Sequence, residues 1–359
     1  MILGAVALTL CCAASAAAGS PSHKSSAPGW SAAVLPPLTG PLGGISCQRS
    51  GTHERCLAVG QSAAGGAALI LLSTDGGKTW APQPAPTGIP ALFRVACTSV
   101  VRCWAAGVAA NGAGAVVATT DGGLSWQAQP IPVVNEVGRI SCKLSHCVAG
   151  GGKLGDRLLV TRDGGTKWSR KTLPQACHTG CPAYIADDVT MASASVAYAV
   201  GGSQCGGSGV TQCPAAIWKS SDGGASWHLV YKRSPFVDAI SCRDASHCWA
   251  AAATFKTGVV LATADGGRHW RAQTLPQFSG YFNAISCLRS GNHDRCYAVG
   301  QNESGTAPVI AVTDNGGSSW KLVAAPHGTG SLFGVEAFAT AARAAGQSVD
   351  GARGTLLLS

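Results

Sequence analysis

The sequence predicts an all-β fold, a seven-bladed β-propeller with four strands in each blade. Three observations predict it: an eight-residue motif occurs six times, the tryptophans that end consecutive copies lie 42–59 residues apart, and each chain end holds an incomplete repeat. Units of about 40–50 residues that contain several short strands are typical of propeller blades.

The repeated motif reads Ser/Thr-x-Asp-Gly-Gly-x-x-Trp, with Asn315 replacing the aspartate in the last copy. Its copies occupy residues 73–80, 119–126, 161–168, 220–227, 263–270 and 313–320. Each copy is expected to form a turn between two strands, because the aspartate can accept N–H groups of its own turn and Gly-Gly supplies positive φ without strain. The tryptophan buries a large apolar area beneath the turn. Lys167 and His269 replace the usual Ser or Thr before the tryptophan, so we expect those two turns to be looser.

This motif resembles the Asp-box, or bacterial neuraminidase repeat. The sequence pattern Asp-Gly-Gly-x-Ser/Thr-Trp also resembles the repeats in the propellers of the sialidases and of the photosystem II assembly and stability factors. The resemblance covers about residues 30–359 and implies a propeller fold. It implies two functions from different classes: glycoside hydrolysis, or a rigid disc that presents loops to a partner.

The two chain ends together are expected to form the seventh blade. Trp30 lies 50 residues before Trp80 but has no motif ahead of it, and residues 354–359 resemble the strand before a motif that is missing. We therefore expect the last blade to take three strands from the C-terminus and its outermost strand from residues near Trp30. Such closure removes an open sheet edge. The alternative is six blades with loose ends.

Fourteen of the sixteen cysteines form seven close pairs along the sequence. Five pairs fall at one equivalent hairpin: Cys47 with Cys56, Cys97 with Cys103, Cys142 with Cys147, Cys242 with Cys248, and Cys287 with Cys296. Two more fall in the fourth repeat: Cys177 with Cys181, and Cys205 with Cys213. Pairs of this kind predict disulfides and an oxidising compartment.

Zinc is the alternative interpretation of these cysteines, with nearby histidines as further ligands: His53, His146, His247 and His293. Because each hairpin offers only two cysteines, four ligands cannot easily gather. We therefore expect no metal or other cofactor.

The N-terminus predicts export. Residues 1–18 are apolar with small residues at their end, and we expect them to be a secretory signal peptide. We expect residues 19–29 to form a flexible lead and residues 30–359 to form the propeller. The chain is therefore expected to be a secreted or cell-envelope bacterial protein, monomeric, with no transmembrane segment after the signal. The net charge of +9 is spread thinly over a chain with 12% charged residues, which argues against nucleic-acid binding.

The face opposite the repeated turns is expected to carry function. It holds the variable loops, and variable loops on a rigid scaffold are where binding usually occurs. The fourth repeat has the longest spacing, and its two extra cysteine pairs are expected to staple loops on this face. Residues at the start of the first strands should surround the central opening, and these are the predicted binding residues: Arg94, Arg139, Asp187, Asp188, Asp238, Tyr281, Phe282 and Asn283.

These residues leave two hypotheses open. The first is a secreted, non-catalytic scaffold that binds a protein or a cell-envelope polysaccharide. The alternative is a sialidase-like glycoside hydrolase, with Asp188 and Asp238 as candidate catalytic carboxylates. Sialidase chemistry requires an arginine triad and a Tyr–Glu pair, and the chain has only four glutamates and five tyrosines. We therefore favour the scaffold.

Overall fold

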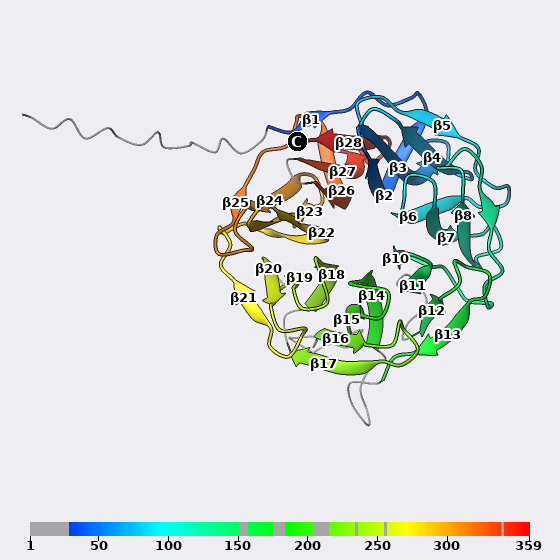
Figure 1. The fold of residues 1–359 in the computed structure, drawn as a ribbon. Helices are drawn as coiled ribbons and strands as arrows, with labels where there is room; N and C mark the ends of the chain where they lie inside the picture. The colour runs from blue at the N-terminus through cyan, green and yellow to red at the C-terminus, as the bar shows by residue number, and fades with distance from the viewer. Residues whose placement is uncertain are drawn as a thin grey trace, which may run out of the picture.

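A computed structural model describes residues 29–150, 157–174, 184–203, 215–233, 236–254, 257–338 and 341–359. Within these ranges the chain forms seven four-stranded antiparallel sheets, and none of the described residues lies in an α-helix. The sheets are arranged as blades around a central axis (Figure 1), which confirms the predicted all-β, seven-bladed propeller.

The first four blades each use four consecutive strands. Blade 1 consists of β2 (Thr39–Ser50), β3 (His53–Ser62), β4 (Ala68–Ser73) and β5 (Ala81–Gln83). Blade 2 consists of β6 (Ala91–Cys97), β7 (Cys103–Val108), β8 (Gly114–Thr119) and β9 (Gln127–Ala128). Blade 3 consists of β10 (Arg139–Lys143), β11 (His146–Gly150), β12 (Arg157–Thr161) and β13 (Ser169–Thr172). Blade 4 consists of β14 (Tyr184–Met191), β15 (Ala197–Ser203), β16 (Ala215–Ser220) and β17 (His228–Arg233).

The remaining blades include the one that joins the two chain ends. Blade 5 consists of β18 (Phe236–Cys242), β19 (Cys248–Ala253), β20 (Gly258–Thr263) and β21 (Arg271–Gln273). Blade 6 consists of β22 (Gly280–Ser290), β23 (His293–Asn302), β24 (Pro308–Thr313) and β25 (Lys321–Leu322). Blade 7 consists of β26 (Thr329–Ala337), β27 (Ala342–Ser348), β28 (Gly354–Leu358) and β1 (Ser31–Ala32).

The ring closes as the sequence predicts. Strand β1 pairs antiparallel with β28, with Ser31 opposite Leu358 (Figure 1). Trp30 is buried against blade 6, where its ring lies edge-on to that of Tyr297 with the centroids 5.9 Å apart. The motif tryptophans take the same place at the other blade interfaces, so Trp30 is the seventh tryptophan of the set.

The apolar core is divided among the blade interfaces. Buried residues form seven clusters, each between two neighbouring blades. The innermost strands are also joined by hydrogen bonds from one blade to the next. The Ser46 hydroxyl accepts the N–H of Cys97 at 3.2 Å, and the Ser286 hydroxyl accepts the N–H of Ala337 at 3.1 Å. Each of these serines lies in an Ile-Ser-Cys sequence in an innermost strand, at residues 45–47 and 285–287, so this serine serves the assembly of the ring.

The Asp-box turns satisfy their own polar groups. In blade 4 the Ser220 hydroxyl donates to Asp222 Oδ1 at 2.8 Å, the Ser226 hydroxyl donates to Oδ2 at 2.6 Å, and the Trp227 indole donates to the Gly224 carbonyl at 3.0 Å. These bonds, that from Ser226 foremost, hold the pKa of Asp222 well below its ordinary value. The polar groups of the turn therefore bond mainly to one another and have little hydrogen-bonding capacity left for a ligand.

The two turns expected to be looser differ from the others at their tryptophans. Among the described Asp-boxes, Trp168 and Trp270 are the tryptophans whose indole N–H has no hydrogen-bond partner. His269 nevertheless replaces the missing hydroxyl, because its Nδ1 lies 2.6 Å from Asp265 Oδ2. Lys167 contributes only its backbone N–H to Asp163 Oδ1, at 3.0 Å, so the third Asp-box is the less complete of the two.

Each Asp-box is also bound by the blade before it. A side-chain donor reaches a turn carbonyl in six cases: Arg343 to Gly76, Arg55 to Asp121, Trp104 to Gly164, Arg162 to Asp222, Lys219 to Gly266 and Trp249 to Gly316. The turns thus hold neighbouring blades together, which explains the regular recurrence of the motif in structural terms.

Five of the predicted disulfides lie at the same end of the disc as the Asp-boxes. They join Cys47 to Cys56, Cys97 to Cys103, Cys142 to Cys147, Cys242 to Cys248 and Cys287 to Cys296. Cys56 pairs across strands with Ser73, the first residue of its Asp-box. In blade 4, Met191 and Ala197 occupy the positions that correspond to the two cysteines.

The structure does not test the other two predicted disulfides. Cys177 and Cys181 lie outside the described residues, and so do Cys205 and Cys213. The bond between Cys177 and Cys181 and the bond between Cys205 and Cys213 therefore stay predictions. The stapling of the fourth-repeat loops, which depends on them, stays a prediction as well.

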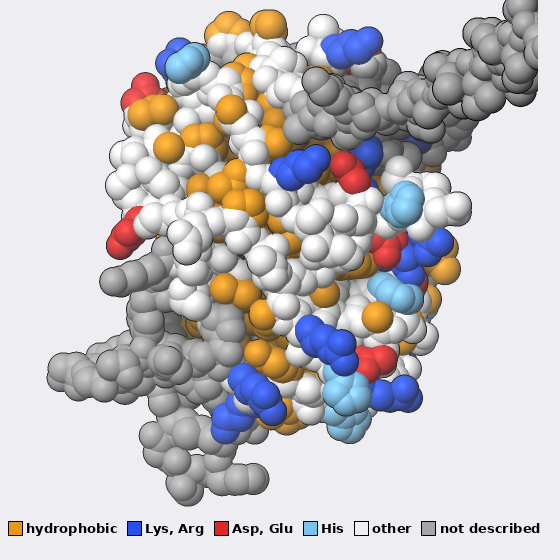
Figure 2. Space-filling model, turned by 90° about the vertical axis from the view of Figure 1, so that its left-hand side faces the viewer, with side chains coloured by type: hydrophobic (Ala, Val, Ile, Leu, Met, Phe, Trp, Pro, Cys, Tyr) orange, Lys and Arg blue, Asp and Glu red, His pale blue; other side chains and the backbone are white. Residues whose placement is uncertain are grey.

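The surface charge is dispersed. Seen from the rim, basic side chains lie among acidic and histidine side chains rather than in one continuous patch (Figure 2). Among the described residues, no helix is long and apolar enough to cross a membrane.

Candidate functional site at the central opening

The candidate site is built from equivalent positions on the seven innermost strands. Six of these strands carry a β-bulge near their start, and the extra residue lies four positions before the end of the Ile-Ser-Cys sequence or its equivalent. The bulged residues are Gly43, Phe93, Asp187, Asp238, Asn283 and Phe333. Gly138 takes this place in blade 3, directly before β10. Bulges redirect side chains and are common beside functional sites.

Arg94 crosses the opening from blade 2. Its guanidinium donates to the carbonyls of Gly43 in blade 1 and Phe333 in blade 7. Gly43 lets the backbones of β2 and β6 approach closely, because a Cβ there would lie 2.6 Å from the Phe93 carbonyl oxygen. Burial, reinforced by nearby Arg139, lowers the pKa of Arg94 to about 9. Arg94 therefore ties three blades together and holds positive charge at the centre.

Arg139 and Asp188 form an ion pair between blades 3 and 4. Arg139 Nε lies 3.6 Å from Asp188 Oδ1, and both side chains are largely buried. Asp188 Oδ2 accepts the backbone N–H of Ile240 at 3.0 Å, which adds a link to blade 5. Burial raises the pKa of Asp188, while Arg139 and Arg94 oppose that rise. Much of this carboxylate's bonding capacity is used inside the protein.

Asp187 and Asp238 are less well satisfied. Burial raises the pKa of each carboxyl to about 7, and the charge of Asp238 contributes to the shift at Asp187. Asp187 Oδ2 is buried and accepts no hydrogen bond within the described part of the chain. Unsatisfied buried polar atoms are rare in native proteins and cost free energy. Asp187 Oδ2 therefore has hydrogen-bonding capacity left for a ligand at the opening.

A cavity of about 320 Å³ lies beside these charges, toward blades 1 to 3. Arg94, Arg139 and Asn283 line it, together with Phe93 and Phe333. The volume is at the lower end of the range for small-molecule sites, which is about 300–1,000 Å³. The structure thus brings predicted residues from blades 2, 3 and 6 to one hollow on the face opposite the Asp-boxes.

Five of the predicted binding residues do not line this cavity: Asp187, Asp188, Asp238, Tyr281 and Phe282. Phe282 has no exposed surface and packs against Phe278 with the ring centroids 5.1 Å apart, so it is a core residue. Tyr281 is half-buried at the start of β22, and its hydroxyl accepts a hydrogen bond from Gln301. The alternation of side chains along a strand explains this correction, because residues next to a lining position point to the other side of the sheet.

Other lining residues were missed by the sequence analysis. Gln61 and Glu136 both line the cavity. Gln61 lies near the end of β3, and Glu136 lies in the segment between blades 2 and 3. Their positions outside the first strands gave no repeat-based signal. Asn283, which was predicted, uses its amide to donate to the Leu332 carbonyl at 2.9 Å.

The Asp-box end of the channel contains one further buried acid. Glu336 occupies the position that holds Ser46, Ser141, Ser241 and Ser286 in other blades. Burial raises the pKa of Glu336 to about 8, and Lys143 opposes the rise. A cavity of about 270 Å³ lies at this level, with polar groups from all seven inner strands around it.

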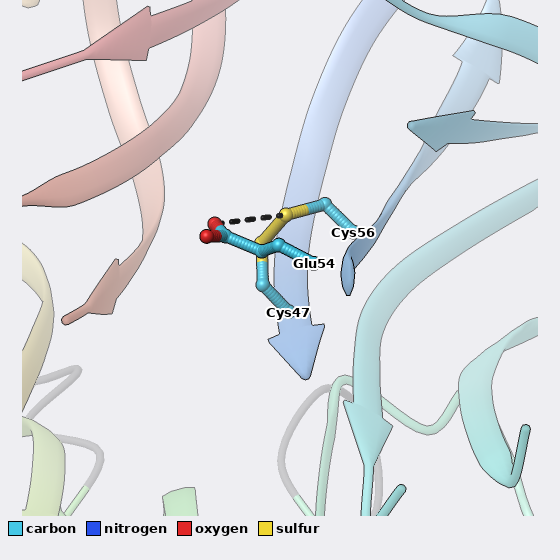
Figure 3. Close-up of side chains that lie close together, drawn as sticks. All are labelled: Cys47, Glu54 and Cys56. Atoms are coloured by element: carbon cyan, nitrogen blue, oxygen red, sulfur yellow. Dashed lines mark hydrogen bonds between the residues drawn. A yellow bond between two sulfur atoms is a disulfide. The ribbon is translucent and has the colours of Figure 1, made fainter. Parts of the chain in front are cut away.

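The one group of possible metal ligands among the described residues is Cys47, Glu54 and Cys56. The two sulfurs are bonded to each other at 2.02 Å, so they offer no thiolate to a metal (Figure 3). Glu54 instead forms ion pairs with Arg49 at 2.6 Å and Arg343 at 3.7 Å. The residues here serve the joint between blades 7 and 1.

Comparisons with known proteins agree with the fold. Residues 71–82 match the BNR/Asp-box repeat family. No curated protein matches the chain. The structure of YCF48 bound to a D1 peptide is 15% identical, with 74% of this chain and 77% of that chain covered and a TM-score of 0.50.

Two further solved structures share the architecture. A GH74 xyloglucanase from Xanthomonas campestris is 15% identical, with 88% of this chain and 52% of that chain covered and a TM-score of 0.60. The structure of U3-55K is 10% identical, with 92% of this chain and 98% of that chain covered and a TM-score of 0.62. At such identities the similarity shows the fold alone. The chain is an all-β protein that carries BNR/Asp-box repeats on a seven-bladed β-propeller.

Proposed function

We propose that this chain is a secreted, non-catalytic scaffold that binds a protein or a cell-envelope glycan through the face opposite the Asp-boxes. One observation carries the proposal: charged side chains from blades 2 to 5 converge at the central opening of that face, beside a cavity. The position three residues before the end of the Ile-Ser-Cys sequence or its equivalent is Arg94, Arg139 and Asp188 in blades 2 to 4, but it is glycine in blades 1 and 7. The charge is thus concentrated on one side of the opening.

The disposition of the arginines supports binding over catalysis. Arg94 is engaged by main-chain carbonyls, and Arg139 is paired with Asp188. Neither is arranged with a third arginine around an open carboxylate site of the kind that the sialidase resemblance implies. The export of the chain rests on its apolar residues 1–18 and on the five described disulfides, which are typical of oxidising compartments.

Site-specific photo-crosslinking tests the proposal. A photoreactive residue at Phe93, beside the cavity, should form adducts in envelope and secreted fractions, and Arg139→Ala should reduce them. The same residue at Lys78, on an Asp-box turn, is the control and should form few adducts. Digestion of the adducts with proteases or glycosidases separates protein from glycan. Equal labelling from the two faces would contradict the proposal.

Glycoside hydrolysis is the second candidate. The raised pKa of Asp238, about 7 because of burial, is the property expected of a catalytic acid. The test is turnover of a fluorogenic glycoside panel that includes a sialoside, with an Asp188→Asn/Asp238→Asn double variant beside the wild type. Turnover that the variant loses would establish an enzyme. Absence of turnover on the whole panel is the outcome expected of a scaffold.

A further inference from the structure

A second polar cavity lies on the other face of the disc, between blades 2 and 3. Its volume is about 230 Å³, and six of its lining residues are Arg102, Ser125, Gln127, Gln129, Asp163 and Thr166. The cavity belongs to the Asp-box end, because Ser125 lies in the second Asp-box and Asp163 and Thr166 lie in the third. It is separate from the central opening and is not part of the site of the proposed function.

A comparison of two equivalent arginines indicates why this cavity is open. Arg55 and Arg102 both directly precede the second cysteine of their hairpin. Arg55 reaches the next blade and donates to the Asp121 carbonyl at 3.2 Å. Between blades 2 and 3 the Trp104 indole makes the corresponding bond, to the Gly164 carbonyl at 3.1 Å. Arg102 is therefore exposed at the cavity instead of being used to join blades.

The third Asp-box also leaves a carboxylate oxygen available at this cavity. In the second and fourth boxes, hydroxyls of Ser125 and Ser226 donate to aspartate Oδ2 at 2.6 Å. Lys167 replaces that serine in the third box, so Asp163 receives bonds only at Oδ1, from Thr161 and the Lys167 N–H, within the described residues. Asp163 Oδ2, which receives no donor from the described residues, and the exposed Arg102 thus lie at the same cavity with bonding capacity left.

The lining residues define the chemistry of a ligand. Asp163 only accepts hydrogen bonds, Arg102 only donates them, and the hydroxyls and amides of Thr166, Gln127 and Gln129 can do both. The two formal charges cancel, which disfavours a simple anion or cation. Trp104 and Ala118 also line the cavity and supply its apolar surface. Groups that both donate and accept, beside apolar contacts, suit a ring that carries several hydroxyls.

We propose that this cavity binds a neutral sugar residue, as one unit of a polysaccharide. Asp163 and Arg102 would hold vicinal hydroxyls, and the two glutamines would fix the orientation of the ring. The volume is below that of drug-sized sites, so the cavity accommodates one small polar unit and not an extended ligand.

The test is NMR titration of the oxidised protein with neutral sugars, namely glucose, galactose, mannose and N-acetylglucosamine, and with glucuronic acid as the charged comparison. Lys167→Ser is the decisive variant, because the new hydroxyl would donate a hydrogen bond to Asp163 Oδ2, as the Ser226 hydroxyl donates to Asp222 Oδ2. It should complete the turn and weaken sugar binding at least tenfold. Asp163→Asn should weaken binding similarly while the turn remains intact, since Asn315 already replaces aspartate in the sixth box.

The matched control is Asp222→Asn, which makes the same change in a box whose Oδ2 is occupied and which lies outside this cavity. Its sugar affinity should equal that of the wild type. The proposal is overturned if no neutral sugar perturbs the protein, if glucuronic acid binds and neutral sugars do not, or if Lys167→Ser binds as tightly as the wild type.

Discussion

The carboxylates on the two faces of this disc have pKa values shifted in opposite directions. On the Asp-box face, the aspartates are surrounded by hydroxyl and N–H donors, and the bonds that Ser226, Ser220 and their neighbours supply keep the pKa of Asp222 low. At the opening on the opposite face, Asp187 and Asp238 lie in partly buried positions, and burial raises the pKa of each to about 7.

This difference separates structure from candidate function. A residue that recurs in almost every blade has hydrogen-bond partners that recur with it. Little of its hydrogen-bonding capacity is therefore left for a ligand. Departures from the repeat, such as Asp187 in blade 4 and Lys167 in blade 3, leave one oxygen of Asp187 and one of Asp163 without a hydrogen-bond donor among the described residues. In a repeat protein, the sites most open to a ligand are therefore those where the repeat is broken.

Reduction of the disulfides should give the largest effect. Each of the five described bonds closes a short hairpin and is expected to contribute about 2–3 kcal/mol to the free energy of unfolding. Thermal unfolding with and without reductant measures the loss. An unchanged melting temperature after complete reduction would show that the strand pairing alone sustains the Asp-box face.

Thiol titration of the mature chain accompanies this measurement. It should find no free thiol before denaturing reduction and fourteen after it, because all fourteen paired cysteines are predicted to be oxidised. Four free thiols before reduction would mean that Cys177, Cys181, Cys205 and Cys213 do not form the two bonds predicted for the fourth repeat.

Removal of a single Asp-box carboxylate should have a smaller effect on that face. Asp222→Ala deprives two hydroxyls and the Ser226 N–H of their acceptor and should cost about 1 kcal/mol. Asp222→Asn should cost less, because Asn315 makes equivalent bonds in blade 6. Chemical denaturation of the three proteins checks the order. Equal losses for the two variants would mean that the charge, and not the acceptor geometry, matters.

The pH dependence of stability should differ in sign between the faces. Because the pKa values of Asp187 and Asp238 are raised, their contribution is present below the ordinary value of 3.8 and is lost as pH rises through about 7. Burial of Asp75 opposes a lowered pKa, but hydrogen bonds from Thr79 and Ser73 outweigh it and lower the pKa to about 2. The contribution of Asp75 is therefore lost as pH falls from 3.8 through about 2.

Thermal unfolding between pH 4 and pH 8 measures this contrast. The wild type should lose stability across that range, and Asp187→Asn/Asp238→Asn should flatten the loss and raise the melting temperature by several degrees at pH 8. Asp222→Asn is the matched control and should leave the slope unchanged. A parallel slope in the double variant would refute the assignment of raised pKa values to the opening.

Completion of the third Asp-box should give the smallest effect, a gain. Lys167→Ser supplies the hydroxyl that Asp163 Oδ2 lacks, and the gain is small because Asp163 is exposed to solvent. A rise in melting temperature of less than about 2 °C is the expected readout. A fall would indicate that the serine does not reach the carboxylate, and that the third turn differs in shape from its counterparts.

Much of the architecture could be predicted from the residues. The six Asp-boxes, the pairing of Cys47 with Cys56 and its four described equivalents, and the closure through Trp30 all follow from local turn chemistry and periodicity. The candidate site was only partly predictable. Their place at the start of the first strands indicated Arg94, Arg139 and Asp187 as residues of the opening, but the same criterion included Phe282, which the alternation of side chains along β22 places in the core.

The sequence by itself determined the structure of a single blade, because the strands, turns and disulfide of a blade are formed by residues close together in the sequence. It also determined the number of blades through the count of tryptophans. Only the tertiary structure decided which side chains meet across blades. Arg94 reaches two other blades past Gly43, Asp188 bonds to Ile240, and Arg102 is left exposed because Trp104 binds Gly164 in its place. These contacts join residues tens to hundreds of positions apart, and they depend on side chains that reach from one blade to another, which no pattern within a single blade encodes.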